Sequence, residues 1–418
     1  ANLEQRMWTT RLYMLSVLSV SSSLSARSAV RSVSSLSQRP ASTRAFRWRG
    51  GSIRMMALKT GIVGMPNVGK STLFNALMEE SQAQAANFPF CTIEPNVGVV
   101  AVPDPKLHKL GEISSSKKVV PTSLSFVDIA GLVAGASKGE GLGNQFLANI
   151  RECDAIVHVV RCFDDENIVH VDGSVDPLRD IDVISLELVL ADLGQVERRL
   201  QKASKDKKTD PNELSALQKL NEGLDNGISA RQIEMSTEER ASVRGLLLLS
   251  EKRVIYAANV LDSELADGND MVNKVAEHAS KEGASYVVVS AQVESELVDL
   301  EADERAEFLE SLGVEAGETG LEKLIREVYS LLQLRTYYTS GETESKAWTI
   351  TEGMLAPQAA GVIHTDFEKG FIRAETVSYD DLVSSGSYQA AKENGLVRSE
   401  GKEYVVQDAD VMLFRFNV

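Results

Sequence analysis

The chain has 418 residues, of which 43% are hydrophobic and 25% are charged, so it is long enough for two or three domains with buried cores and is not a disordered chain. Residues 61–418 carry a net charge of −25, which argues against binding nucleic acid by bulk charge but leaves room for a local basic patch. The three cysteines are too few and too irregularly spaced for a disulfide framework or a metal knuckle, which favours a reducing compartment.

Residues 1–56 have the composition of a targeting segment. They are rich in Ser and Arg and contain a single acidic residue, Glu4. This composition is typical of a transit peptide for a chloroplast or a mitochondrion. The alternative is a disordered basic tail, which would leave the protein in the cytoplasm. The apolar stretch at residues 12–20 is too short to span a bilayer, and we expect no membrane association.

An apolar strand, a glycine-rich loop and an amphipathic helix follow one another at residues 58–80. The loop reads Gly64-x-x-x-x-Gly69-Lys70-Ser71, which is a P-loop between the strand and the helix that it requires. Its backbone N–H groups favour phosphates, Lys70 would reach the β and γ phosphates, and the Ser71 hydroxyl would hold Mg²⁺. The predicted phosphate-binding residues are Asn67, Val68, Gly69, Lys70, Ser71 and Thr72.

Two later segments provide candidate switch residues. Thr92, in a segment that Pro89 and Pro95 would hold extended, is a candidate Mg²⁺ ligand, although spacing alone does not distinguish it from a surface threonine. Asp128 ends an alternating strand and, with Gly131, fits the D-x-x-G signal of a γ-phosphate switch. Asp128 would bind Mg²⁺ through a water, and the Gly131 N–H would sense the γ-phosphate.

Leu132 stands where many GTPases place the glutamine that orients the attacking water. This replacement predicts either slow intrinsic turnover or a water that another group positions. His170, in a loop soon after the apolar run at residues 154–160, is the candidate catalytic group; a purely structural histidine is the alternative.

A helical insertion is expected at residues 181–250. The interval from Asp128 to Asn259 is far longer than one helix, one strand and their loops require. A coiled-coil seam and then a return helix occupy it, and the insertion would be either domain core or an exposed arm for a partner. The seam positions are Leu186, Val189, Leu193, Val196 and Leu200, and the return helix carries Leu214, Leu217 and Leu224.

The next strand ends at Asn259, where proteins of this class recognise the base. Val260, Leu261 and Asp262 follow, so the lysine of the guanine-specific N-K-x-D motif is absent. If the Asp262 carboxylate faced the base, it would favour GTP. If it points away, Asn259 would bond the adenine amino group and the backbone of Val260 or Leu261 would read the base edge, which favours ATP. Ser290, after the following strand, is the last predicted base contact.

Residues 334–418 form a separate pattern of short alternating strands, with a helix expected in "DDLVSSGSYQAAKEN". This pattern is typical of a small α+β domain. His364, Asp366 and Glu368 lie close together there, but their alternation on one turn argues against a metal site.

The segments "GMPNVGKST", "NFPFCTIEPN", "DIAGLVAGASKGEGLGNQF" and "APQAAGVIHTDFEKGFIRAE" closely resemble the Obg-like ATPase family, also called YchF. The resemblance implies an α/β fold: a P-loop NTPase with a doubly wound, mostly parallel sheet, a helical coiled-coil insertion and a C-terminal β-grasp (TGS) domain. The NTPase domain would occupy residues 57–180 and 251–333, the insertion 181–250 and the TGS domain 334–418.

The same resemblance implies ATP as substrate, with GTP binding more weakly, and association with ribosomes, with RNA contacts through the TGS domain. It places Phe163 against the adenine. Related potassium-activated proteins coordinate K⁺ at the position of Asn67. Family members normally have Glu where this chain has Asp262, which is a departure toward the GTPase pattern.

The sequence therefore predicts a Mg²⁺-dependent, ATP-hydrolysing switch that docks on an organellar ribosome. A GTPase of ribosome assembly is one alternative, with Asp262 as its best support. A nucleotide-gated adaptor whose hydrolysis is incidental is the other, supported by Leu132 in the glutamine position.

Overall fold

A computed structural model describes residues 58–84, 96–129, 142–314 and 319–417. The predicted transit segment, Thr92 and Gly131 lie outside these ranges. Among the helices in the described residues, none is long and apolar enough to cross a membrane.

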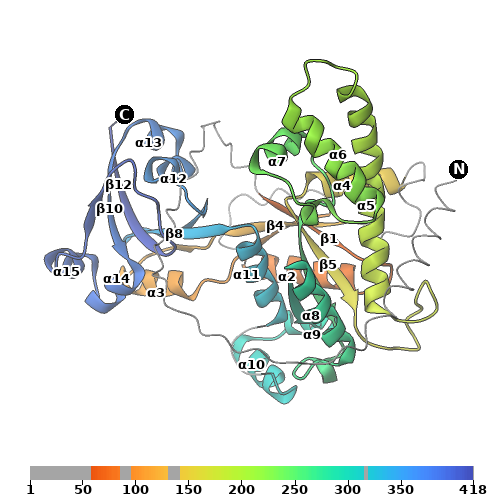
Figure 1. Cartoon of the computed structure of the whole chain (residues 1–418). Helices are drawn as coiled ribbons and strands as arrows, with labels where there is room; N and C mark the ends of the chain where they lie inside the picture. Colours follow the sequence, from red (N-terminus) through yellow and green to blue (C-terminus); the bar gives the residue numbers. More distant parts are fainter. Residues whose placement is uncertain (1–57, 85–95, 130–141, 315–318, 418) are drawn as a thin grey trace, which may run out of the picture. The chain divides into compact units, whose positions relative to one another are not determined.

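The first sheet has the strand order β2-β4-β1-β5-β6-β7. All neighbours run parallel except β2, which is antiparallel to β4. The central strands are almost continuously buried because helices cover both faces of the sheet, and this confirms the predicted doubly wound, mostly parallel sheet (Figure 1). The strands are β1 (Lys59–Val63), β2 (Val97–Ala101), β4 (Ser123–Asp128), β5 (Ala155–Arg161), β6 (Arg253–Asn259) and β7 (Ser285–Val289).

Short polar residues begin the helices around this sheet. Asn269 caps α8, Ser290 caps α9, and Thr319 forms a capping box with Glu322 at the start of α11. The sheet and these helices share one hydrophobic core, with Ile62, Phe126 and other fully buried side chains at its centre. The helices are α2 (Lys70–Gln84), α4 (Leu142–Glu152), α8 (Asp270–Glu282), α9 (Ala291–Leu297), α10 (Ala302–Ser311) and α11 (Gly320–Leu331).

The helical insertion grows out of a helix that belongs to both cores. Helix α5 (Pro177–Ala203) begins at the Asp176 cap, and Ile181 in its first half packs in the core of the first sheet. Its second half packs with α6 (Pro211–Asp225) and α7 (Thr237–Val243) in a separate core. A boundary at residue 181 therefore falls inside one continuous helix.

The predicted seam is correct from Val189 onward and wrong at Leu186. Val189 and Val196 are buried in the insertion core, whereas the Leu186 side chain is 38% exposed. Around Leu186, helix α5 still packs on the first sheet through Ile184 and Leu188, so these residues form its buried face there. The buried positions of the coiled-coil seam therefore begin one turn later, at Val189.

The C-terminal region contains the second sheet, in the order β11-β10-β12-β8-β9-β3. The helix expected in "DDLVSSGSYQAAKEN" is two helices, because Gly386, with φ of +73°, ends the first in the left-handed conformation. The strands are β8 (Leu334–Ser340), β9 (Ser345–Thr351), β10 (Phe371–Ser378), β11 (Arg398–Glu400) and β12 (Asp410–Phe416), and the helices are α12 (Ala356–Ile363), α13 (Thr365–Lys369), α14 (Tyr379–Ser385) and α15 (Tyr388–Glu393).

The last strand of this sheet comes from a distant part of the chain. Strand β3 (Val119–Val120) pairs parallel with β9, and α3 (Pro105–Ile113) buries Leu107 and Leu110 in the hydrophobic core on one face of the second sheet. The Tyr338 hydroxyl donates a hydrogen bond of 2.8 Å to the Asp104 carboxylate. Residues between β2 and β4 of the first sheet therefore complete the second.

Candidate nucleotide site

The P-loop follows β1 and lies in close contact with β5 and with the end of β6. Asn67 and Gly69 have φ values of +60° and +94°, which turn the backbone toward the start of α2. A Cβ at Gly64 would lie 2.4 Å from the Val159 carbonyl, and one at Gly69 would lie 2.4 Å from the Asn259 side-chain nitrogen. Glycine is therefore required at both positions, because the loop backbone lies too close to β5 and β6 to leave room for a side chain.

Lys70 lies across this loop and is 7% exposed. Its Nζ donates a 2.6 Å hydrogen bond to the carbonyl of Met65. Burial lowers the pKa of Lys70 to about 8, and the Asp128 carboxylate partly offsets this effect. The cation is thus held over the loop that the sequence assigns to phosphates.

Asp128 and Ser71 fit a Mg²⁺ ion. Burial raises the pKa of Asp128, while Lys70 and hydrogen bonding by the Ser71 hydroxyl act in the opposite direction. Within the described residues, the buried Oδ1 of Asp128 has no hydrogen-bond partner. A buried carboxylate oxygen without a partner, beside a hydroxyl, is the donor set that a hard divalent cation prefers.

His170 is buried and held at both ring nitrogens. Its Nδ1 accepts from the Asp172 backbone N–H at 3.2 Å, and its Nε2 lies 2.9 Å from the Asp180 carboxylate, so Nε2 carries the proton. In this arrangement both ring nitrogens are bonded to protein groups, and the catalytic role stays a prediction. Among the described residues, His170, Asp172 and Asp180 also have the spacing of a metal site, but Arg179 forms ion pairs with both carboxylates.

Asn259 braces the site. Its Nδ2 donates to the Val68 carbonyl at 2.9 Å, and its Oδ1 accepts from the Ala291 N–H at 2.9 Å. The residue therefore links the P-loop to the start of α9, and the Oδ1 that would accept from the adenine amino group already accepts from a backbone N–H. Ser290 is fully buried as the α9 cap.

The backbone beyond Asn259 is also partly bonded. The N–H of Val260 donates to Val289 in the sheet, and that of Leu261 makes a long contact of 3.4 Å with Glu264. Asp262 is exposed, and its carboxylate accepts from the next backbone N–H, that of Ser263, at 2.7 Å. This carboxylate is turned onto its own chain.

Phe163 follows β5 on the neighbouring strand end and is 8% exposed. The Arg161 guanidinium lies over its ring, with Cζ 4.8 Å from the ring centroid. The family resemblance pointed to Phe163, and no motif in the sequence pointed to Arg161. The only signal was an arginine at the end of a strand that is apolar except for His158.

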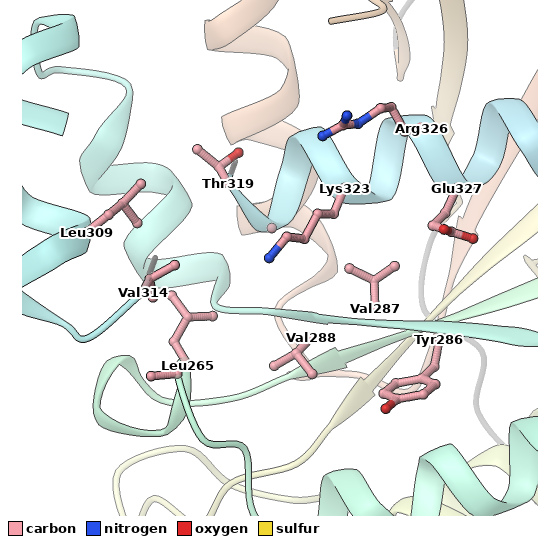
Figure 2. A pocket seen from close by; sticks show the side chains of 12 residues that line it. Leu265, Tyr286, Val287, Val288, Leu309, Val314, Thr319, Lys323, Arg326 and Glu327 are labelled. Atoms are coloured by element: carbon pink, nitrogen blue, oxygen red, sulfur yellow. The ribbon is translucent and has the colours of Figure 1, made fainter. Parts of the chain in front are cut away.

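A cavity of about 600 Å³ lies elsewhere, between β7 and α11 (Figure 2). Lys323 and Arg326 of α11 line it together with Tyr286 and Val288 of β7. It contains no residue of the predicted nucleotide site, and it is therefore not the place where the P-loop would hold phosphates.

The strand ends bring together the P-loop, Asp128, Phe163, Asn259 and Ser290, all from the carboxyl edge of the first sheet. In a doubly wound sheet this edge is where ligands bind. The chain is therefore a P-loop nucleoside triphosphatase by fold and by site.

Comparisons with known proteins extend this result. A sequence family described as "50S ribosome-binding GTPase" matches residues 59–191, and YchF-GTPase_C, described as "Protein of unknown function (DUF933)", matches residues 334–417. The "Ribosome-binding ATPase YchF" of Bacillus subtilis is 55% identical over 369 residues, which cover 87% of this chain and 100% of that protein. The protein of the same name from Escherichia coli O157:H7 is 54% identical over 367 residues, with the same coverage of 87% and 100%.

A solved structure agrees with these matches. The Schizosaccharomyces pombe "YchF GTPase" superposes with a TM-score of 0.77 at 38% identity, covering 88% of this chain and 99% of that one. Since the similarity extends over the whole length of these relatives, the chain belongs to the YchF family of Obg-like P-loop proteins.

Proposed function

We propose that this protein is an ATP-hydrolysing switch that binds ribosomes. The observation that carries the proposal is the buried Asp128 oxygen, which has no hydrogen-bond partner among the residues that the structure describes and lies beside Ser71 and the P-loop lysine, because this set fits a Mg²⁺–triphosphate. The names of the curated relatives, "Ribosome-binding ATPase YchF", support both the substrate and the partner.

In the proposed mechanism the chain binds and orients the triphosphate. The backbone N–H groups of residues 67–72 surround the phosphates, and Lys70 transfers its hydrogen bond from the Met65 carbonyl to the β and γ phosphates. Ser71 and Asp128, with Thr92 of the first switch, would hold Mg²⁺, which neutralises phosphate charge when bound. Gly131 would sense the γ-phosphate.

The attacking water requires a group other than glutamine. We assign this role to His170, whose segment is attached to the P-loop because the Asn67 Nδ2 donates to the Val169 carbonyl at 3.2 Å. Its ring would have to leave Asp180 or Asp172 when nucleotide binds. Replacement of His170 by Ala should slow hydrolysis at least tenfold with little change in the dissociation constant for ATP, as general acid–base groups contribute about 10²- to 10⁴-fold.

ATP is the proposed substrate in preference to GTP. The exposed Asp262 carboxylate accepts from the Ser263 N–H, which supports a base pocket that lacks the acceptor pair for guanine. Phe163 would lie against the adenine, with Asn259, Val260, Leu261 and Ser290 around the base. Isothermal titration of one sample with both nucleotides tests this: tighter binding of ATP supports it, and tighter binding of GTP favours the alternative of a ribosome-assembly GTPase.

Nucleotide gating separates the enzyme from the adaptor alternative. Lys70→Ala would bind nucleotide much more weakly, whereas His170→Ala would bind it normally and hydrolyse it slowly. Equal ribosome cosedimentation of His170→Ala and the unaltered protein, across repeated turnover, would indicate that hydrolysis is incidental. Accumulation of His170→Ala on ribosomes would support a hydrolysis-driven switch.

Location and ion dependence are further parts of the proposal. The Ser- and Arg-rich residues 1–56 support import into a chloroplast or mitochondrion, and a fusion of these residues to a fluorescent protein tests it. Diffuse cytoplasmic fluorescence would contradict it. A K⁺ ion bound near Asn67 predicts faster hydrolysis in potassium than in sodium chloride at the same ionic strength.

A further inference from the structure

Arg161 is the largest fully buried side chain of the described residues, at 1% exposure. It is the last residue of β5, beside Asn259 in the sheet register. Its guanidinium is directed at the loop that follows β5. Three backbone carbonyls converge on it.

The three hydrogen bonds come from three different nitrogens. Nε donates to the Phe163 carbonyl at 3.1 Å, Nη1 to Ile168 at 3.0 Å and Nη2 to Asp165 at 3.2 Å. A buried charge is costly unless its donors are satisfied, so this loop conformation is favoured because it is the one that supplies all three acceptors. A lysine has a single nitrogen and cannot reach three acceptors spread around a planar fork.

The loop held in this way connects both sides of the nucleotide site. At its start, the ring of Phe163 packs on the guanidinium. At its end, the carbonyl of Val169 accepts the hydrogen bond from Asn67 of the P-loop. The Cys162 carbonyl is separately anchored by the Asn269 side chain at 2.6 Å. Arg161 therefore fixes the part of the loop that lies between two independent anchors.

We propose that Arg161 is a positioning residue for adenine recognition, which holds the Phe163 ring at the angle and height at which a purine stacks on it. The proposal rests on the proposed function, in which Phe163 lies against adenine. Arg161 itself touches no part of the nucleotide. It acts by removing the freedom of the ring and of residues 163–168, so that binding does not have to order them.

The test compares Arg161→Lys, Phe163→Ala and the double variant in the full chain, by titration with ATP, GTP and tripolyphosphate. Tripolyphosphate reports the P-loop without a base. Arg161→Lys should weaken ATP binding roughly tenfold, in the range of one lost base–aromatic contact, weaken GTP binding by a similar factor because both purines can stack, and change tripolyphosphate binding less than about twofold. The double variant should bind ATP no more weakly than Phe163→Ala, because both changes remove the same contact.

Additive losses in the double variant, or equal losses for ATP and tripolyphosphate, would overturn the proposal, since Arg161 would then act on the fold or on the P-loop. If Phe163→Ala weakens ATP and Arg161→Lys does not, the positioning role alone fails. If Phe163→Ala leaves ATP binding unchanged, the base contact in the proposed function fails first, and the positioning role fails with it. If Arg161→Lys does not fold, Arg161→Gln, which keeps one amide donor group, replaces it under the same criteria.

Discussion

The two sheets of this protein use their edges differently. In the first sheet all strands except β2 run parallel to one another, so that the carboxyl ends of these strands place Asp128, Arg161 and Asn259 at one edge. In the second sheet the directions are mixed, and hydrophobic cores lie on both faces, around Tyr337 and around Tyr338. Parallel strands thus bring polar groups together at one edge of the first sheet. The second sheet instead depends for its stability on the helices that pack on its two faces.

The largest effect is expected from uncovering the second sheet. Leu110→Ala, at a fully buried α3 position, should lower the free energy of unfolding by about 2 to 5 kcal/mol. The affinity for ATP should stay the same, because α3 packs on the other sheet. Guanidinium denaturation and ATP titration measure the two quantities. Leu413→Ala, at a side chain that is 43% exposed, is the control and should cost far less. A loss of ATP affinity as large as the loss of stability would mean that the two regions are not independent.

The converse experiment alters the nucleotide edge alone. Lys70→Ala should weaken ATP binding by roughly 1.5 to 3 kcal/mol, since hydrogen bonds to charged groups are worth that much. The thermal midpoint of the nucleotide-free protein should not fall, because burial disfavours the Lys70 cation there. The exposed Lys109 provides the control as Lys109→Ala. Unchanged ATP binding in Lys70→Ala would remove the phosphate assignment.

A pH titration tests the interior of the first sheet. Burial lowers the pKa of His158 in β5 to about 3, with Lys70 acting in the same direction, so His158 is neutral in the folded protein while the unfolded chain binds a proton near pH 6.5. Stability should therefore fall as the pH drops below about 6.5, by roughly 1 to 2 kcal/mol between pH 7 and 5 from this residue. His158→Phe should lose that part of the slope, and His108→Gln, at an exposed position, should keep it. Equal slopes in all three proteins would show that His158 binds a proton in the folded protein as readily as in the unfolded chain.

The smallest effect is expected at Asp262. Because its carboxylate is exposed and bonded to the next backbone N–H, Asp262→Ala should change the dissociation constant for ATP by less than about twofold, as surface substitutions usually do. The same titration with GTP shows whether the Asp262 carboxylate contributes to guanine binding. A loss of GTP affinity of roughly tenfold would show that the carboxylate turns to face guanine when nucleotide binds.

Site residues that lie at the end of a strand could be predicted from the sequence. The P-loop spacing, the position of Asp128 and the end of β6 at Asn259 are fixed by short motifs at changes of hydrophobic pattern, and the structure has the strands ending there. Arg161 was not accessible, because its partners are backbone carbonyls and no side-chain pattern marks them. The same limit applied to Asn259, whose amide was assigned to the base and is bonded to backbone groups of the P-loop and α9.

The second sheet was predicted less completely. The pattern of short alternating strands was predicted there, and it corresponds to β9, β10 and β12, whereas β8 and β11 were not singled out. A strand of two residues such as β3 is too short to show any alternation. The prediction that Leu186 belongs to the coiled-coil seam was wrong because periodicity shows which residues share a helix face, but not which neighbouring element that face contacts.

Strand β3 has a consequence for where this chain can be cut. Residues 334–417 match a sequence family of their own, yet their sheet is finished by Val119 and Val120. A fragment starting at residue 334 would leave the backbone groups of β9 that pair with β3 without partners. It would also expose the hydrophobic surface on which Leu107 and Leu110 pack. Such an edge recruits strands from other molecules, so the isolated fragment should self-associate, and a soluble version would have to carry residues 103–122 on a new linker.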